Sequence, residues 1–190
     1  MSVEVGVIAL QGDVPQHSAA VKRAFDEVIV HEIRETGIVP SCELVVLPGG
    51  ESTTISHLLQ TTGIAREITE HVEAGKAMLA TCAGLIVSAT QVDDDRIDTL
   101  DLLDITVERN AYGRQRDSFE APLSFEEFAD PFPGVFIRAP RITAVGDCEI
   151  LAHHGDEPVA VRSGSVIGAS FHPELTDDTR LLELTRATGK

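Results

Sequence analysis

Residues 77–89 read AMLATCAGLIVSA, and this stretch decides the fold. Ala77–Ala80 is a short apolar run of the kind found in a buried strand. It leads directly into Thr81-Cys82-Ala83-Gly84, and the apolar stretch Leu85–Ala89 that follows favours a helix. A buried strand that turns sharply into a helix is typical of a parallel α/β sheet, so this is the fold class that we predict.

The segments before this stretch repeat the alternation of strand and helix. The predicted strands are Val3–Leu10, Val28–Ile33 and Leu44–Leu47. The predicted helices are Val14–Phe25 (with Asp13 as its N-cap), Ser52–Gln60 and Ile64–Ala74, the last ended by Gly75. Pro48-Gly49-Gly50 is a predicted turn. In such sheets ligands bind at the carboxyl ends of the strands, so chemistry is expected just after each strand.

The second half of the chain has a different pattern of short strands separated by turn residues. These predicted strands are Ile105–Arg109, Glu120–Ser124, Gly134–Ile137, Ile142–Val145, Glu149–His153, Val159–Arg162 and Val166–Ser170. We expect them to extend the sheet and to add a small antiparallel extension. Thr176 or Asp177 is the predicted cap of a last helix that runs through Arg186. No repeat, low-complexity tract or linker divides the sequence, so residues 1–190 are predicted to form one domain.

The charge balance excludes two classes of partner. The chain has 15 basic and 31 acidic residues, a formal net charge of −16, which repels nucleic acid and anionic membranes. Among the basic residues only Lys22, Lys76 and Lys190 are lysines. An acidic, lysine-poor surface suits a protein from a high-salt habitat, where screening weakens self-repulsion. An ordinary acidic soluble protein is the alternative.

Several features predict a cytoplasmic location. No apolar run approaches the roughly 18–20 residues that span a bilayer. The first ten residues carry an acid and no basic residue, unlike a secretory signal. The cysteines Cys42, Cys82 and Cys148 form no CxxC pair, so neither a disulfide framework nor a zinc site is indicated.

Cys82 is the candidate nucleophile. It lies between the predicted strand and helix, and Ala80 and Gly84 are small enough to permit a strained elbow. Unpaired N–H groups at a helix N-terminus also stabilise a thiolate. The N–H groups of Ala83 and of the Pro48-Gly49-Gly50 turn are candidates for an oxyanion hole. A small buried hydrophobic residue is the alternative interpretation of Cys82.

His172 and Glu174 are the candidate base and its orienting acid. Both follow the strand Val166–Ser170, and an acid two residues after a histidine can fix its tautomer and stabilise the imidazolium. A structural histidine is the alternative. Cys42 and Cys148 lack such a setting, and His153-His154 lacks a third ligand at suitable spacing. We therefore predict no metal and no cofactor.

These motifs resemble the class I (triad) glutamine amidotransferases, and within them the glutaminase subunits of pyridoxal 5′-phosphate synthase. The matching blocks run in the same order over nearly the whole chain: Leu10–Gly12, Leu47–Thr54, Thr81–Leu85, Val107–Asn110, Gly113–Gln115, Val135–Pro140 and Ser170–Thr176. The PGGEST and FIRAP blocks are the most specific. The resemblance implies a three-layer, flavodoxin-like fold with a mostly parallel sheet. It also implies hydrolysis of L-glutamine to L-glutamate and ammonia by Cys82, His172 and Glu174.

The resemblance further implies the residues that bind glutamine and the partner that uses the ammonia. The binding residues would be Gly49, Gly50, Glu51, Arg109, Ile137 and Arg138, with Gly50 and Ala83 forming the oxyanion hole. The partner would be a (β/α)₈-barrel synthase subunit. Arg109 and Arg138 suit the α-carboxylate of glutamine, with surface ion pairs as the alternative. Glu51 would meet the ammonium or favour the N-terminus of the next helix. The family usually has glycine at the position of Ala80, which puts the elbow geometry in question.

Three other functions stay open from the sequence. One is a glutaminase subunit of the histidine or purine pathway. Another is a non-catalytic regulatory subunit with the same fold, although the intact triad argues against it. The third is a cysteine α/β-hydrolase, in which the acid precedes the histidine, whereas here it follows.

Overall fold

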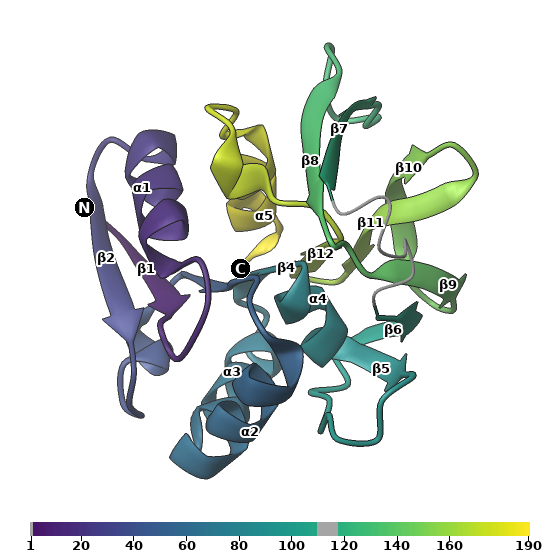
Figure 1. The fold of residues 1–190 in the computed structure, drawn as a ribbon. Helices are drawn as coiled ribbons and strands as arrows, with labels where there is room; N and C mark the ends of the chain where they lie inside the picture. Colours follow the sequence, from purple (N-terminus) through teal and green to yellow (C-terminus); the bar gives the residue numbers. More distant parts are fainter. Residues whose placement is uncertain (1, 110–117) are drawn as a thin grey trace.

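A computed structural model describes residues 2–109 and 118–190 (Figure 1). Its central sheet has the strand order β10-β11-β12-β4-β3-β1-β2. The strands β12, β4, β3, β1 and β2 run parallel, whereas β11 and β10 continue the sheet antiparallel. In sheet order their bounds are β10 Glu149–His154, β11 Glu157–Ser163, β12 Val166–Ala169, β4 Ala77–Thr81, β3 Leu44–Leu47, β1 Val3–Ile8 and β2 Val28–Ile33.

Helices cover both faces of this sheet, which gives three layers. The helices α1 (Val14–Ala24) and α5 (Arg180–Thr188) pack on one face. The other face carries α2 (Ser52–Thr62), α3 (Ile64–Glu73) and α4 (Ala83–Ser88). Successive side chains of β3 enter opposite cores, because a strand alternates its faces. The fold is the predicted α/β class with a mostly parallel sheet.

Two small sheets accompany the large one, as Figure 1 shows. One contains β5 (Ala89–Val92), β6 (Leu103–Glu108) and β9 (Arg141–Val145); the other pairs β7 (Ser118–Leu123) with β8 (Phe132–Ile137). Of the later strands, β10, β11 and β12 extend the sheet as predicted, and the antiparallel pairs β6–β9 and β7–β8 form the predicted antiparallel extension as separate small sheets. The β7–β8 pair is anchored by aromatic rings, with Phe119 and Phe136 stacked at 4.6 Å between centroids.

Some local predictions were wrong. The last helix begins at Arg180 with Thr179 at its N-cap, not at Thr176 or Asp177, because Thr176 ends the 3₁₀ helix η2 (Pro173–Leu175). The first strand ends at Ile8 rather than Leu10. The strand β5 and the short 3₁₀ helix η1 (Val39–Ser41) were not predicted. In the described part of the chain, no helix combines the length and hydropathy needed to cross a membrane.

The parallel strands β1, β3, β4 and β12 are neighbours, and their carboxyl ends converge on one edge of the sheet. The segments after these strands carry Gly12, Gly49, Cys82 and His172, respectively. A further bond ties the small β7–β8 sheet to this edge, because the His172 N–H donates to the Val135 carbonyl at 2.8 Å. The fold thus brings residues from distant parts of the sequence to one place.

The acidic surface predicts salt-dependent stability. With a net charge of −16, repulsion opposes folding, and it weakens as the Debye length falls from about 10 Å at 0.1 M salt to about 3 Å at 1 M. Exposed ion pairs such as Arg66–Glu70 are weakened too, but each contributes only about 0–1 kcal/mol. We expect the melting temperature to rise across a potassium chloride series at neutral pH. When the same series is measured at a pH near the isoelectric point, the melting temperature should rise less with salt. A melting temperature that is flat or falls with salt at neutral pH would contradict the prediction.

Candidate active site

Cys82 occupies the predicted turn between β4 and α4. Its backbone has φ 48° and ψ −106°, a conformation outside the favoured regions for a residue with a side chain. Such strain persists only where the surrounding structure enforces it, and it gathers at functional sites. The Cys82 side chain is 8% exposed, and its Sγ lies 4.0 Å from the carbonyl oxygen of Ile137. The sulfur is therefore held at the carboxyl edge of the sheet, next to β8.

The residues around the turn explain how it is accommodated. A Cβ on Gly84 would lie 2.2 Å from the Leu47 carbonyl oxygen, so only glycine allows α4 to pack this closely on β3. Ala80 pairs with Leu47 on one side and Gly168 on the other. The alanine that departs from the family pattern thus lies beside a glycine, and the elbow forms with Ala80 fully buried.

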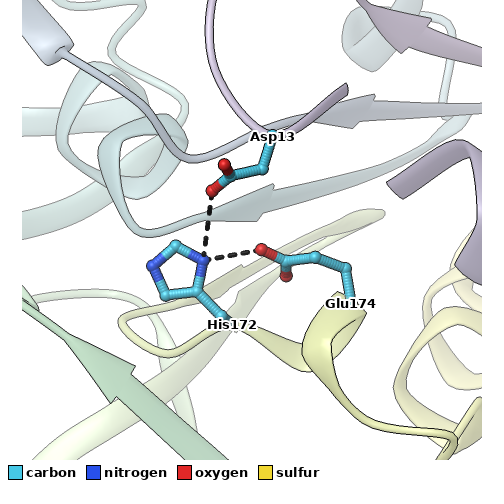
Figure 2. A group of neighbouring side chains, drawn as sticks. All are labelled: Asp13, His172 and Glu174. Carbon is cyan, nitrogen blue, oxygen red and sulfur yellow. Dashed lines mark hydrogen bonds and ion pairs between the residues drawn. The ribbon is translucent and has the colours of Figure 1, made fainter. Parts of the chain in front are cut away.

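His172 and Glu174 form a buried pair next to the cysteine. The His172 Nδ1 lies 2.6 Å from Glu174 Oε1, and the two residues are each 4% exposed. The carboxylate of Asp13 lies 3.7 Å from the same Nδ1, and Figure 2 shows both carboxylates directed at this nitrogen. The short contact fixes Nδ1 as the protonated nitrogen, because it faces a carboxylate, and leaves Nε2 to act as base.

The surroundings of His172 make it a strong base. Burial lowers the pKa of His172, but its interactions with Cys82 and Glu174 raise it to about 10. Burial raises the pKa of Glu174, yet the hydrogen bond from His172 and the nearby His17 hold it below its usual value. Glu174 is therefore ionised at neutral pH, and His172 is basic enough to accept a proton from a thiol.

The glycine turn after β3 lies against both catalytic side chains. A Cβ on Gly49 would lie 2.8 Å from His172 Cε1 and 3.3 Å from Cys82 Cβ. A Cβ on Gly50 would meet Gln11 Oε1 at 2.3 Å. The Gly49 carbonyl accepts a hydrogen bond from the Asp13 N–H at 3.2 Å. These contacts explain why two glycines stand here and place the 49–50 peptide beside the nucleophile.

A cleft of about 670 Å³ opens over the cysteine. Of the predicted site residues it is lined by Gly50, Glu51, Cys82, Ala83, Arg109, Ile137, Arg138 and His172. Gly49 and Glu174 lie behind His172 rather than on the cleft wall. The structure therefore brings the whole predicted set together. Asn110 and Gly113–Gln115, which belong to the resembling blocks, lie outside the described residues.

Glu51 is the N-cap of α2. Its carboxylate accepts hydrogen bonds from the N–H groups of Thr53 and Thr54, at 3.2 and 2.7 Å, and from both hydroxyls. Burial raises the pKa of Glu51, but these bonds lower it to about 2. The helix-capping role that the sequence left open is thus present in the structure. Contact with a ligand ammonium stays a prediction.

The two arginines of the cleft differ in their partners. Arg109 is 16% exposed, donates to Glu51 Oε1 at 3.2 Å and is paired with Asp94, while its backbone N–H donates to Asp93. Arg138 has no ion-pair partner within residues 2–109 and 118–190, and its φ of 42° follows the end of β8. Arg138 is therefore the cation of this cleft that is more available to an anionic ligand group.

Sequence reasoning gave no part in the active site to three residues that the structure places there. Gln11 accepts the Glu51 N–H at 2.7 Å and so supports the glycine turn. Asp13 stands at the N-cap of α1 but makes no side-chain cap bond, because its carboxylate faces His172. His17, also on α1, lies 3.4 Å from Glu174 Oε2. The spacing of Asp13 and His17 by four residues was the available signal, since it places both on one helix face.

Among the described residues, one group has the spacing of metal ligands: Asp13, His172 and Glu174 (Figure 2). His153 and His154 are not part of it. The hydrogen bond between His172 and Glu174 uses the Nδ1 that a metal would need, and the pair is explained without an ion. The absence of a metal stays a prediction.

Comparison with known proteins gives the same family that the motifs suggested. A model of the SNO glutamine amidotransferase family matches residues 7–185. Pyridoxal 5′-phosphate synthase subunit PdxT of Haloarcula marismortui is 60% identical over 97% of this chain and 96% of its own length. The PdxT subunit of Halobacterium salinarum is 59% identical over 97% and 93%. Both relatives come from halophilic archaea, as the acidic composition led us to expect.

Solved structures agree with the sequence relatives. A crystal structure described as a glutamine amidotransferase superposes with a TM-score of 0.89 at 43% identity and covers 97% of each chain. PurLQS of Thermotoga maritima shares the fold at a TM-score of 0.73 and 15% identity, over 98% of each chain. With its family model, its close relatives and this fold, the chain belongs to the SNO glutamine amidotransferase family.

Proposed function

We propose that this chain hydrolyses L-glutamine to L-glutamate and ammonia, and that it supplies the ammonia to a synthase subunit that makes pyridoxal 5′-phosphate. One observation carries the proposal: Cys82, on its strained turn, lies beside the buried His172–Glu174 pair at the floor of a polar cleft. A nucleophile, a base and an orienting acid in this order constitute a triad for acyl transfer. Family membership supports glutamine as the acyl donor.

The first half of the reaction forms a thioester. His172 accepts the thiol proton, and the Cys82 sulfur attacks the side-chain amide carbon of glutamine. The carbonyl oxygen becomes an oxyanion, for which the N–H groups of Gly50 and Ala83 are the proposed donors. When the tetrahedral intermediate collapses, the C–N bond breaks and His172 protonates the departing nitrogen. Ammonia leaves, and the γ-glutamyl thioester stays on Cys82.

The second half hydrolyses the thioester. His172, now neutral, takes a proton from water, and the hydroxide attacks the thioester carbon. The same oxyanion hole stabilises the second intermediate. The C–S bond then breaks, His172 returns its proton to the sulfur, and glutamate is released. Throughout, Glu174 stabilises the imidazolium form of His172 through the 2.6 Å contact with Nδ1.

The cleft walls supply groups for the two charged ends of glutamine. Arg138 suits the α-carboxylate, and Arg109 lies nearby but shares its charge with two acids. Glu51, whose pKa is about 2, is ionised and suits the α-ammonium. Gly50 and Ile137, which line the cleft, and Gly49, next to Gly50 in the chain, are the proposed source of backbone contacts to the substrate. A substrate held at both ends would present its amide to Cys82.

The partner and setting follow from the same chemistry. We infer that residues 1–190 are one glutaminase domain, because the family model spans residues 7–185. The PdxT relatives are named as synthase subunits, so a separate subunit that consumes ammonia is expected here too. We propose that this subunit is a (β/α)₈ barrel. A cytoplasmic setting suits the reaction, because the free thiol of Cys82 must stay reduced to act.

The test is transfer of glutamine nitrogen into pyridoxal 5′-phosphate. The chain is purified with the pyridoxal-phosphate synthase subunit of its own source and given amide-¹⁵N glutamine, a pentose phosphate and a triose phosphate. We expect ¹⁵N in the pyridine ring and one glutamate released per ring formed. Glutamate release without ¹⁵N in pyridoxal 5′-phosphate would overturn the assignment of pathway. So would glutamate release that only a histidine- or purine-pathway synthase subunit stimulates. No glutamate release in any mixture would overturn the glutaminase.

A further inference from the structure

A third buried side chain lies behind the catalytic pair. His17, the fourth residue of α1, is 1% exposed, and Glu174 beside it is 4% exposed. The His17 Nε2 lies 3.4 Å from Glu174 Oε2 and 3.2 Å from the hydroxyl of Thr81, which precedes Cys82. The reaction described above uses only the other oxygen of Glu174, and Figure 2 shows Oε2 turned away from the His172 ring.

The Oε2 atom needs a donor. It is buried and makes no hydrogen bond that meets strict geometry among the described residues. A carboxylate oxygen that is buried without a partner is costly, because it has lost its water without replacement. The polar side-chain atom recorded next to it is His17 Nε2 at 3.4 Å, a nitrogen that also shares a hydrogen bond with the Thr81 hydroxyl.

The protonation of His17 follows from its surroundings. The titratable groups that face it are Glu174, His172 and Asp13; burial lowers its pKa, and it is neutral at pH 7. A neutral imidazole carries one N–H and one bare nitrogen. A bare Nε2 would oppose the lone pairs of Oε2, so the favourable tautomer has the proton on Nε2. In this tautomer Nε2–H faces two oxygens, the Thr81 hydroxyl at 3.2 Å, with which it shares a hydrogen bond, and Glu174 Oε2 at 3.4 Å.

We propose that His17 is a positioning residue that fixes Glu174 by donating its Nε2–H to Oε2. The inference rests on the proposed glutaminase function. With a donor on each oxygen, the carboxylate cannot rotate and its charge stays directed at His172. The donor on Oε2 also favours the ionised form of Glu174. Without it, Glu174 would take up a proton at higher pH, and His172 would lose its orienting charge.

The test compares replacements that keep or remove the donor. His17→Gln places an amide N–H near the position of Nε2, whereas His17→Leu fills the space with no donor and His17→Asn cannot reach as far. Each variant is assayed with the synthase subunit for kcat, for KM of glutamine and for the pH dependence of kcat. Melting temperature is measured in parallel.

We expect His17→Leu to lower kcat by about 10- to 100-fold with little change in KM. The acid limb of its pH profile should move up by about one pH unit. His17→Gln should stay within a few-fold of the parent. His71 offers a matched control, because it is also a buried histidine with a lowered pKa, but its Nε2 bonds the Ala77 carbonyl. His71→Leu should lower the melting temperature without moving the pH profile.

Two outcomes overturn the proposal. One is a parent-like kcat and pH profile in His17→Leu. The other is equal loss in all three His17 variants with an unmoved acid limb, which indicates packing alone. If His17→Leu does not fold, the comparison of His17→Gln with His17→Asn decides, since only the first keeps the donor in reach. Glutaminase activity in the parent complex separates these results from failure of the proposed function, which would leave the parent itself inactive.

Discussion

Replacing Cys82 by alanine or serine is expected to abolish glutamine hydrolysis, with a loss of roughly 10⁴-fold or more. The thioester is the only covalent route that the site offers, and alanine has no nucleophile. Serine keeps a hydroxyl in place, but a hydroxyl is far harder to ionise than a thiol at neutral pH. Both variants should fold, because alanine and serine carry a Cβ as cysteine does and add no backbone strain at φ 48°.

The measurement is steady-state glutamate release by the complex, together with mass spectrometry after treatment with a diazo-ketone analogue of glutamine. The parent should gain one analogue adduct on Cys82, and Cys82→Ala should gain none. Cys148→Ala is the control, since Cys148 is a half-buried free cysteine that is not among the residues lining the cleft. Parent-like turnover in Cys82→Ala would show that another group is the nucleophile.

The other triad members should follow in a definite order. His172→Asn is expected to be nearly as damaging as the loss of Cys82, because His172 is the one imidazole among the described residues that line the cleft. Glu174→Gln should retain more activity, because an amide oxygen can still accept the Nδ1–H of His172 and hold part of its orientation.

Adding the synthase subunit is expected to accelerate glutamine hydrolysis by roughly 10²–10³-fold, the value of one oxyanion-hole donor. Ammonia released into neutral water is mostly protonated and no longer nucleophilic, so hydrolysis without a consumer would waste glutamine. The 49–50 peptide is the proposed control point. It has glycine on both sides, and its carbonyl is held by one hydrogen bond, the 3.2 Å contact from the Asp13 N–H.

The experiment titrates the synthase subunit at saturating glutamine and follows ammonia release. We expect kcat to rise and then level off at a fixed ratio of subunits. Gly49→Ala is informative alongside it, because its Cβ would lie 2.8 Å from His172 Cε1 and disturb the base. This variant should still bind the synthase subunit, but its kcat for ammonia release should stay low when the subunit is added. A free chain that is already fully active, and unchanged by its partner, would refute the idea.

Local patterns sufficed for much of the fold. The strand β3 has the bounds that its apolar run predicted, because a buried strand in a parallel sheet is a continuous hydrophobic segment. The edge strand β2 also has its predicted bounds, although most of its residues are half-buried or exposed. Cys82 and His172 were identified for a related reason: both directly follow buried strands, where a parallel sheet gathers its functional residues. The motif that flanks each one then gave the family.

What the sequence did not reveal depends on long-range contacts. In the small sheets, β6 pairs with β9 although β7 and β8 lie between them in the chain, and β7 pairs with β8 across residues 124–131. No local pattern specifies which short strand finds which partner. His17 was missed because a helix pattern treats it as one more buried position on α1. Its proximity to Glu174 spans most of the chain and exists only once the sheet has formed. The pairing of Arg109 with Asp94 is of the same kind.

The hydrogen bond from the His172 N–H to the Val135 carbonyl has a consequence for how the protein ages. It fastens the catalytic base to a two-stranded ribbon, and such a ribbon is only marginally stable unless other groups hold it down. Here the hold comes from aromatic packing, including Phe136 against Phe171 at 5.7 Å. Proteins open by segments, and the weakest segment opens first. We therefore expect local opening of the β7–β8 pair to displace His172 and abolish activity while the central sheet is still folded. Activity should then be lost on storage sooner than the fold.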